Sequence, residues 1–266
     1  MDKLGKLKAI LRKMGSMLVA YSGGIDSSFL LKVAGSQLGD RVLAVTAVSE
    51  TYPKEELKLA KQLARKFGAR HKIIRTKELN NPKFRNNPVD RCYYCKKELF
   101  ATLKGIALKN KINFVVDAGN LTDKNDFRPG EKVKKELGIR SPLSEAGFTK
   151  NDIRLISKRL GLAIWNKPSL ACLASRIPYG SRITKGTLSR IDKAEQFLRQ
   201  YGFSQVRVRH YNDLCRIEVL PGNIKYLLAK SKDIVDNFKK LGYNYVTVDL
   251  EGFRTGSMNE TLKRGQ

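Results

Sequence analysis

A serine- and glycine-rich segment at residues 22–28, SGGIDSS, carries the residue types of a phosphate-binding loop. It follows an apolar run at residues 17–21, so we expect it to join a buried strand to a helix at about residues 26–38. Gly23 and Gly24 allow a pyrophosphate to approach the main chain, whose N–H groups then point at its oxygens. Further hydroxyl donors are expected from the serines of the loop, Ser22, Ser27 and Ser28.

The carboxylate of Asp26 lies inside this loop and can hold the Mg²⁺ that accompanies a nucleoside triphosphate. The loop lacks the Gly-Lys-Ser/Thr ending of a Walker A motif, which argues against transfer of a γ-phosphate. A flexible turn between strand and helix is the alternative interpretation of the same residues. The sequence predicts a nucleotide site in which Asp26 is the magnesium ligand.

Cysteines at four positions provide a second set of candidate reactive groups. Cys92 and Cys95 form a CxxC pair, a spacing typical of metal and redox sites. Cys215 falls on the apolar face of its expected strand and is interpreted as a small buried hydrophobe. With Cys172, three thiols remain, and three thiolates can hold a [4Fe-4S] cluster whose fourth iron is open to a sulfide or a substrate sulfur. Unrelated buried and surface thiols are the alternative.

Cys172 lies in the segment 167–180, KPSLACLASRIPYG, where two expected domains meet. Lys167 and Arg176 lie on either side of it, and an electropositive setting suits a reactive thiol. In a reducing compartment, four cysteines are more in keeping with ligands or nucleophiles than with a disulfide framework. We therefore expect Cys172 to take part in the chemistry.

Strands and helices alternate in the first part of the chain. Apolar runs predict strands at residues 17–21, 41–48, 70–75 and 114–117. Helical spacing of apolar residues predicts helices at about residues 26–38, 53–67, 96–110 and 150–160. This order is typical of βαβ units in an α/β fold with a parallel sheet, where ligands bind at the carboxyl ends of strands. The SGGIDSS loop lies at such an end.

A polar segment at residues 120–130 also follows the carboxyl end of an expected strand. It contains the sequence DFRPG, in which Asp126 and Arg128 are candidates for contact with a substrate. An ordinary surface turn is the alternative. The first domain is expected to close near Pro168, which divides the chain into residues 1–168 and 169–266.

The second part of the chain predicts a small α+β domain. Helices are expected at residues 184–201 and 223–241, and strands at 205–211, 214–220 and 245–251. In the first of these strands Arg207 and Arg209 share one face, because successive side chains alternate across a strand. The sheet is expected to present an apolar face to its helices and this basic face outward. Two such arginines can donate paired hydrogen bonds to one phosphate group. The alternative is that this face is simply solvent-exposed and binds no ligand.

Composition bounds the class of protein. The chain has 266 residues, of which 41% are apolar, enough for two modest cores. It has no stretch of roughly 20 apolar residues that would span a bilayer and no signal-peptide pattern, so a cytoplasmic protein is expected. The net charge of +27 attracts phosphate-bearing partners, of which RNA is the largest. Solvated lysines are the favoured interpretation, since charge alone sets only non-specific affinity.

The loop YSGGIDSS resembles the SGGxDS signature of the PP-loop ATP pyrophosphatases, which include NAD synthetase, GMP synthetase and tRNA-thiolating enzymes. The resemblance implies an adenine nucleotide alpha hydrolase-like fold. It also implies a reaction in which ATP is cut between its α- and β-phosphates, an oxygen is activated as an adenylate, and pyrophosphate is released.

The chain resembles one branch of this superfamily over nearly its whole length, the LarE family of ATP-dependent sulfur transferases. The segments that carry the resemblance are the loop, NPVDRCYYCKKELF, DFRPG, KPSLACLASRIPYG and VTVDLEGFRTGSMNE. The family implies adenylation of a carboxylate of a pyridinium mononucleotide (pyridinium-3,5-biscarboxylic acid mononucleotide) and its conversion to a thiocarboxylate, in nickel-pincer nucleotide biosynthesis. It also suggests a homo-oligomer.

The resemblance implies two possible sulfur sources. Family members with a single cysteine give up the sulfur of the residue that matches Cys172, whereas members with a CxxC as well hold a [4Fe-4S] cluster through three cysteines. By residue types this chain resembles the second group, with Cys92, Cys95 and Cys172 as ligands. A separate sulfur donor is then an expected partner.

Further site residues follow from the same resemblance. Arg207 and Arg209 match positions that bind the substrate phosphate, and three more match active-site positions, Ser175, Arg176 and Glu195. Residues 117–120, DAGN, depart from the DGTN of the family, and this departure argues against close contacts with the adenylate there. A PP-loop tRNA-thiolating enzyme and a non-catalytic nucleotide- or cluster-binding module remain the two alternatives.

Overall fold

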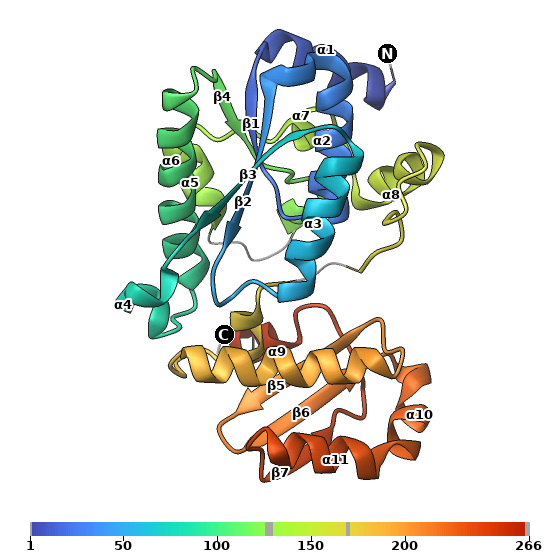
Figure 1. The fold of residues 1–266 in the computed structure, drawn as a ribbon. Helices are drawn as coiled ribbons and strands as arrows, with labels where there is room; N and C mark the ends of the chain where they lie inside the picture. The colour runs from blue at the N-terminus through green and yellow to red at the C-terminus, as the bar shows by residue number, and fades with distance from the viewer. Residues whose placement is uncertain (1, 126–129, 169–170, 264–266) are drawn as a thin grey trace. The chain divides into compact units, whose positions relative to one another are not determined.

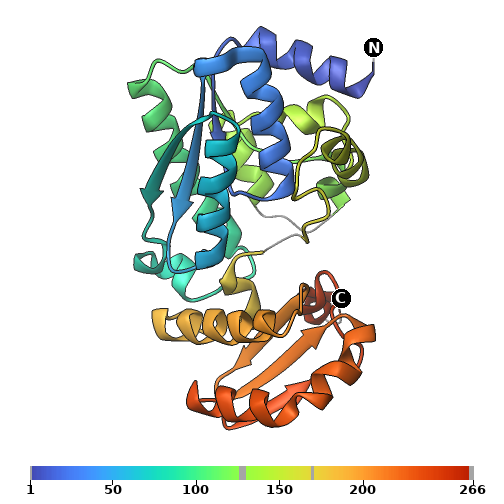
Figure 2. The same ribbon diagram turned by 45° about the vertical axis from the view of Figure 1, so that its right-hand side comes forward.

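The computed structural model describes residues 2–125, 130–168 and 171–263 (Figures 1 and 2). Its internal contacts divide the chain into two compact units. The first takes in residues 1–84 and 89–170, and the second takes in residues 85–88 and 171–266. Each unit has a sheet and a core of its own.

The first unit contains a four-stranded parallel sheet in the order β3-β2-β1-β4. Its strands are β1 (Met17–Ala20), β2 (Val42–Val48), β3 (Arg70–Arg75) and β4 (Phe114–Val116). The predicted α/β class with a parallel sheet is thereby confirmed. Because β1 and β4 are neighbours, the segments that follow them lie at one edge of the sheet, where the SGGIDSS loop begins.

Helices cover both faces of this sheet, which is why its central strands are continuous apolar runs. The helices are α1 (Lys3–Met14), α2 (Ile25–Leu38), α3 (Lys54–Lys66), α4 (Pro82–Arg85), α5 (Arg91–Lys109), α6 (Gly130–Leu137), α7 (Pro142–Glu145) and α8 (Lys150–Arg159). Met17 and Val19 pack with α1, α2 and α3, whereas Leu18 packs on the opposite face with α5 and α6. Figure 1 shows these two groups of helices on either side of the sheet.

Two helix boundaries differ from expectation. Helix α5 begins at Arg91, five residues earlier than predicted, so the CxxC pair lies in its first turns rather than in a loop. The reason is tertiary, because Arg91 is buried and Tyr93 packs against the sheet. In the second unit, the helix predicted at 223–241 is two helices, separated at Lys230. Among the described residues, five further helices were not predicted: α1, α4, α6, α7 and α12.

The second unit is the predicted small α+β domain. Strands β5 (Val206–Tyr211) and β6 (Leu214–Val219) are antiparallel, and β7 (Tyr245–Val248) lies parallel to β6. The helices are α9 (Lys185–Gln200), α10 (Ile224–Ala229), α11 (Ser231–Lys240) and α12 (Glu260–Lys263). The core forms between α9, α10 and α11 and one face of β5 and β6.

A short stretch between α4 and α5 belongs to the second unit. Asn87 is fully buried there with a left-handed φ of 55°, and its side-chain amide donates to the carbonyls of Ile177 and Pro178 at 3.3 and 2.7 Å. Its own carbonyl accepts from Gly180 N–H at 2.9 Å. Asparagine suits this position because it tolerates φ > 0 better than most residues.

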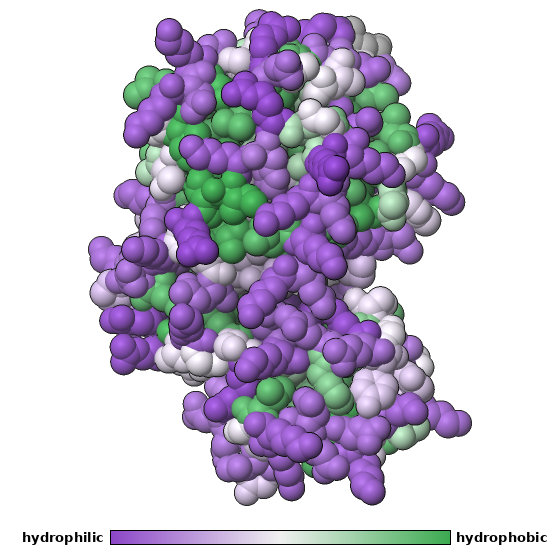
Figure 3. Space-filling model, viewed as in Figure 1, coloured by the Kyte–Doolittle hydropathy of each residue, from purple (hydrophilic) through white to green (hydrophobic). Residues whose placement is uncertain are grey.

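The surface in view is mostly hydrophilic, with smaller hydrophobic areas between (Figure 3). This agrees with lysines and arginines that are spread over exposed helix faces. Among the described helices, none has the length and apolar character to cross a membrane.

Candidate functional site

The SGGIDSS loop joins β1 to α2, as predicted. Gly23 has a φ of 69°, and a Cβ at this position would lie 2.8 Å from the Cβ of Ala60 in α3. Both the backbone conformation and the close approach therefore require glycine here. Gly24 is the N-cap of α2 and has extended backbone angles. The loop main chain is thus held tightly against α3, at the N-terminus of a helix that can receive an anion.

The serines of the loop are held by one another and by two tyrosines. The hydroxyls of Ser22 and Ser27 lie 3.1 Å apart, and Tyr52 donates to the Ser22 carbonyl at 2.7 Å. Ser28 is buried, with its hydroxyl 3.4 Å from that of Tyr21. Ser22 is exposed, whereas Ser27 and Ser28, in the first turn of α2, are buried. Direct contact with phosphate is therefore most accessible to Ser22.

Asp26 has the environment of a cation ligand. Its Oδ2 accepts a hydrogen bond of 2.5 Å from Lys150, while its Oδ1 is buried and has no hydrogen-bond partner among the described residues. Burial raises the pKa of this carboxyl, Lys150 opposes the rise, and the negative charge of Asp123 adds to it. A buried acceptor without a donor fits a divalent cation, which would take oxygen ligands here.

Sequence reasoning missed Lys150 and Asp123. Lys150 is the first residue of α8, which begins with a capping box between Thr149 and Asp152. Its main-chain N–H donates to the Thr122 hydroxyl at 3.0 Å, which brings α8 to the segment after β4. The strand order of the sheet could have identified both residues. Because β4 lies next to β1, polar residues that follow β4 lie beside the loop that follows β1.

The DAGN segment after β4 is held by a buried lysine. Lys134 lies 3.1 Å from Asp117 Oδ2 and donates to the Ser141 hydroxyl at 2.9 Å, and Ser141 donates to Asp117 Oδ1 at 2.5 Å. A Cβ on Gly119 would lie 2.9 Å from Lys134 Nζ, so the backbone passes close to this group. The departure from the family sequence therefore coincides with a compact local network. Two candidates, Asp126 and Arg128, lie outside the described residues.

The cysteines occupy three kinds of setting. Cys92 is exposed and Cys95 is partly buried near Glu78, both in the first unit, and Cys172 is exposed at the start of a 3-10 turn in the second unit. Cys215 is fully buried, and burial raises the pKa of its thiol to about 12. The interpretation of Cys215 as a buried hydrophobe is confirmed.

The donor set of Cys92, Cys95 and Cys172 suits an iron–sulfur cluster by its chemistry, because thiolates are the usual ligands of such clusters. Within the ranges that the structure describes, no group of three or more His, Cys, Asp or Glu side chains is arranged to hold a metal ion. The cluster therefore stays a prediction.

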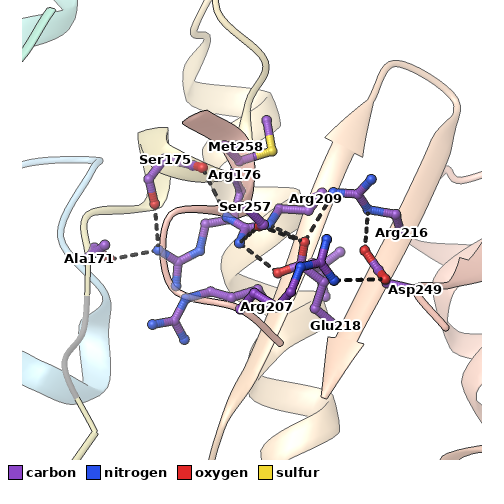
Figure 4. Close-up of polar contacts among 12 residues, drawn as sticks. Ala171, Ser175, Arg176, Arg207, Arg209, Arg216, Glu218, Asp249, Ser257 and Met258 are labelled. Carbon is purple, nitrogen blue, oxygen red and sulfur yellow. Dashed lines mark hydrogen bonds and ion pairs between the residues drawn. The ribbon is translucent and has the colours of Figure 1, made fainter. Parts of the chain in front are cut away.

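The expectation that the arginine face of the second sheet points outward is wrong. Arg207 and Arg209 are 4% and 5% exposed, although they do lie opposite the apolar core face of β5, as predicted. Two segments cover them. Arg209 donates to the Ser175 carbonyl at 3.1 Å and to the Ser257 hydroxyl at 2.9 Å (Figure 4). Arg207 lies over the ring of Phe253.

A buried carboxylate orients each of two arginines in this cluster. Glu218 accepts from Arg209 at 2.9 and 2.6 Å, and Glu195 accepts from Arg176 at 2.8 and 3.0 Å. Burial, together with the positive charges of Arg176 and Arg209, lowers the pKa of Arg207 to about 9. Several buried guanidinium groups thus lie close together, a setting that suits an anion.

Comparison with known proteins relates the chain to several full-length sequences. Residues 9–86 match the family model of asparagine synthase. The chain is 41% identical over 265 residues to the pyridinium-3,5-bisthiocarboxylic acid mononucleotide synthase of Lactiplantibacillus plantarum. The match covers 99% of this chain and 96% of the synthase. Uncharacterized proteins of Synechocystis sp. and Methanocaldococcus jannaschii are 42% and 32% identical, over 99% and 96% of this chain and 99% and 98% of theirs.

Proposed function

Because this chain belongs to the family of the pyridinium-3,5-bisthiocarboxylic acid mononucleotide synthase, we propose that it converts a carboxylate of a pyridinium mononucleotide into a thiocarboxylate with consumption of ATP. The LarE-type family and the ATP-dependent, sulfur-inserting enzyme class predicted from the motifs are confirmed. The substrate that we propose is pyridinium-3,5-biscarboxylic acid mononucleotide, an intermediate on the way to the nickel-pincer nucleotide.

The observation that carries the proposal is the Asp26 carboxylate at the phosphate-binding loop. One of its oxygens is held by Lys150, and the other is buried with no partner among the described residues. In the first step a substrate carboxylate oxygen attacks the α-phosphorus of ATP, an acyl adenylate forms and pyrophosphate leaves. Mg²⁺ held by Asp26 would neutralise charge on the pyrophosphate, and the loop N–H groups and Lys150 would bind its oxygens.

In the second step a sulfur nucleophile attacks the acyl carbon, AMP leaves with the bonding electron pair, and a thiocarboxylate remains. AMP makes this step feasible because a free carboxylate oxygen is a poor leaving group. We assign the sulfur to a [4Fe-4S] cluster on Cys92, Cys95 and Cys172, which would supply a sulfide when bound. The alternative sulfur source is Cys172 itself. The alternative functions are thiolation of tRNA and a non-catalytic nucleotide- or cluster-binding module.

The second unit would bind the substrate phosphate. Support comes from the neighbouring guanidinium groups of Arg207 and Arg209, whose positive charges act on each other, and from the exposed Cys172 on a turn that contacts Arg209 through Ser175. A guanidinium fork is well matched to phosphate oxygens. We therefore assign adenylation to residues 1–168 and phosphate binding with sulfur transfer to residues 169–266.

Anaerobic purification tests both parts of the proposal. The wild-type chain and Cys92→Ala are assayed for iron and sulfide, for pyrophosphate release with the biscarboxylate nucleotide, and for product mass. We expect pyrophosphate from both proteins, but iron and repeated turnover only from the wild type. A colourless, iron-free wild type that loses one sulfur from Cys172 after a single turnover would support the sacrificial route. Pyrophosphate release with tRNA alone would favour the RNA-thiolating alternative.

A further inference from the structure

Arg176 and Glu195 cannot reach a substrate in this structure, because both side chains are 0% exposed. They form a two-point ion pair in which Arg176 Nε and Nη2 lie 2.8 and 3.0 Å from the two oxygens of Glu195. Burial alone would raise the pKa of the Glu195 carboxyl, but the charges of Arg176 and its neighbours lower it below its ordinary value. The pair is therefore ionised and enclosed by protein.

The remaining nitrogen of Arg176 faces the turn that carries Cys172. Its Nη1 donates to the Ala171 carbonyl at 2.7 Å and to the Ser175 hydroxyl at 3.0 Å (Figure 4). It also donates to the Cys172 carbonyl at 3.0 Å. Cys172 is the N-cap of the turn Leu173–Arg176, and its carbonyl also accepts from Ser175 N–H at 3.0 Å. One guanidinium thus fixes the main chain on both sides of the thiol-bearing residue.

Glu195 is in turn fixed to the sheet. Its Oε1 accepts from the Val208 N–H of β5 at 3.1 Å, and its Oε2 accepts from Arg199 at 2.8 Å. The contacts therefore run without a gap from a strand of the second unit, through Glu195 and Arg176, to the backbone of Cys172. Arg209 adds a second hold through the Ser175 carbonyl.

Cys172 itself is exposed. A rigid main chain that presents an accessible thiol is the arrangement that a positioned nucleophile or ligand needs, since small displacements of a reacting group cost rate. We propose that Arg176 and Glu195 are positioning residues that hold the Cys172 turn for sulfur delivery, and that they are not substrate ligands. The inference rests on the proposed function for its catalytic readout, but not for its structural one.

The test uses a double variant, Arg176→Met with Glu195→Met, because removal of one partner alone leaves a buried charge whereas replacement of both by apolar groups is often tolerated. We expect thermal stability near that of the wild type. Amide exchange in residues 171–176 should be at least about tenfold faster, while exchange in β5 and β6 stays unchanged. Sulfur transfer should fall about 100-fold in kcat with KM for the nucleotide and pyrophosphate release unaffected.

Arg176→Lys, which keeps the charge pair but loses the forked bonds to the turn, gives the same readouts if the double variant does not fold. Lys193→Met, at an exposed position of α9, is the matched control. Wild-type exchange and wild-type transfer in a stable double variant would overturn the inference, as would a rise in KM at constant kcat. If the wild type forms no thiocarboxylate at all, the proposed function fails, and the exchange of residues 171–176 still decides whether the pair holds the turn.

Discussion

Lys150 donates a 2.5 Å hydrogen bond to Oδ2 of Asp26, and this contact joins the first residue of α8 to the phosphate-binding loop after β1. The two residues are 124 positions apart in the chain, and the order of the parallel sheet brings them together. The Lys150 ammonium on one carboxylate oxygen, and the buried second oxygen without a partner among the described residues, suit the Mg²⁺ and polyphosphate that we propose for this site.

Asp26→Asn should abolish metal-dependent pyrophosphate release, with a loss of at least about 100-fold, since the developing charge loses its counter-ion. Lys150→Met should reduce release less, by about 10- to 100-fold, because the loop N–H groups remain. A coupled assay of pyrophosphate at varied Mg²⁺ measures both. Full release by Asp26→Asn at saturating Mg²⁺ would remove Asp26 from the site.

Asp26→Asn should lower activity but raise the thermal stability of the protein at neutral pH. Burial raises the folded-state pKa of Asp26, so the folded protein binds its proton more tightly than the unfolded chain does. The stabilisation is present below the unfolded pKa and is lost as pH rises through the folded pKa. Asp26→Asn should therefore raise Tm at pH 7 by roughly 1–3 °C and leave Tm nearly unchanged at pH 3. A lower Tm at pH 7 would contradict this sign.

Gly23→Ala tests whether the loop requires its close packing on α3. The new methyl would have to displace Ala60, and the φ of 69° is strained for alanine, so nucleotide affinity should fall by at least about tenfold. Gly68→Ala is the control, because Gly68 has a similar φ of 64° with no atom within 4 Å of a new Cβ. It should lose about 1 kcal/mol of stability and keep its affinity. Equal losses of affinity in both variants would mean that contact with Ala60 is unimportant.

The sequence predicted the parts of this structure that depend on local pattern. The loop, the parallel sheet, the β5–β6 hairpin and the burial of Cys215 all follow from apolar periodicity and glycine placement. It failed where distant chain segments decide the outcome. The strand pattern placed Arg207 and Arg209 on the face away from the core, but no local signal indicated that Phe253 and Ser257 would cover them. Lys150 likewise looked like an ordinary residue at the start of a helix.

Asn87→Ala should destabilise the second unit, although α5 of the first unit begins only four residues later, at Arg91. The variant loses the side-chain bonds to the carbonyls of Ile177 and Pro178 and places alanine at a φ of 55°, which together cost roughly 2–4 kcal/mol. Asn86→Ala, at the exposed neighbouring position, should stay within about 0.5 kcal/mol. Amide exchange of Gly180 and Ile183, which donate to this stretch, measures the effect. Unchanged protection of both amides would show that the stretch is not anchored there.

Phosphate binding to the second unit should appear as stabilisation by a simple phosphate ester. The charged form of Arg207 is destabilised, because burial and the nearby arginines lower its pKa to about 9. A bound phosphate dianion stabilises that charged form. A pyridine mononucleotide at about 100 times its Kd should add about 2.7 kcal/mol to stability. Arg207→Met should lose the gain at every pH, whereas Arg182→Met, at an exposed position, should keep it.

Thermal unfolding of the three proteins with and without the ester, from pH 7 to pH 10, measures the gain. A gain that Arg207→Met retains would place the phosphate elsewhere.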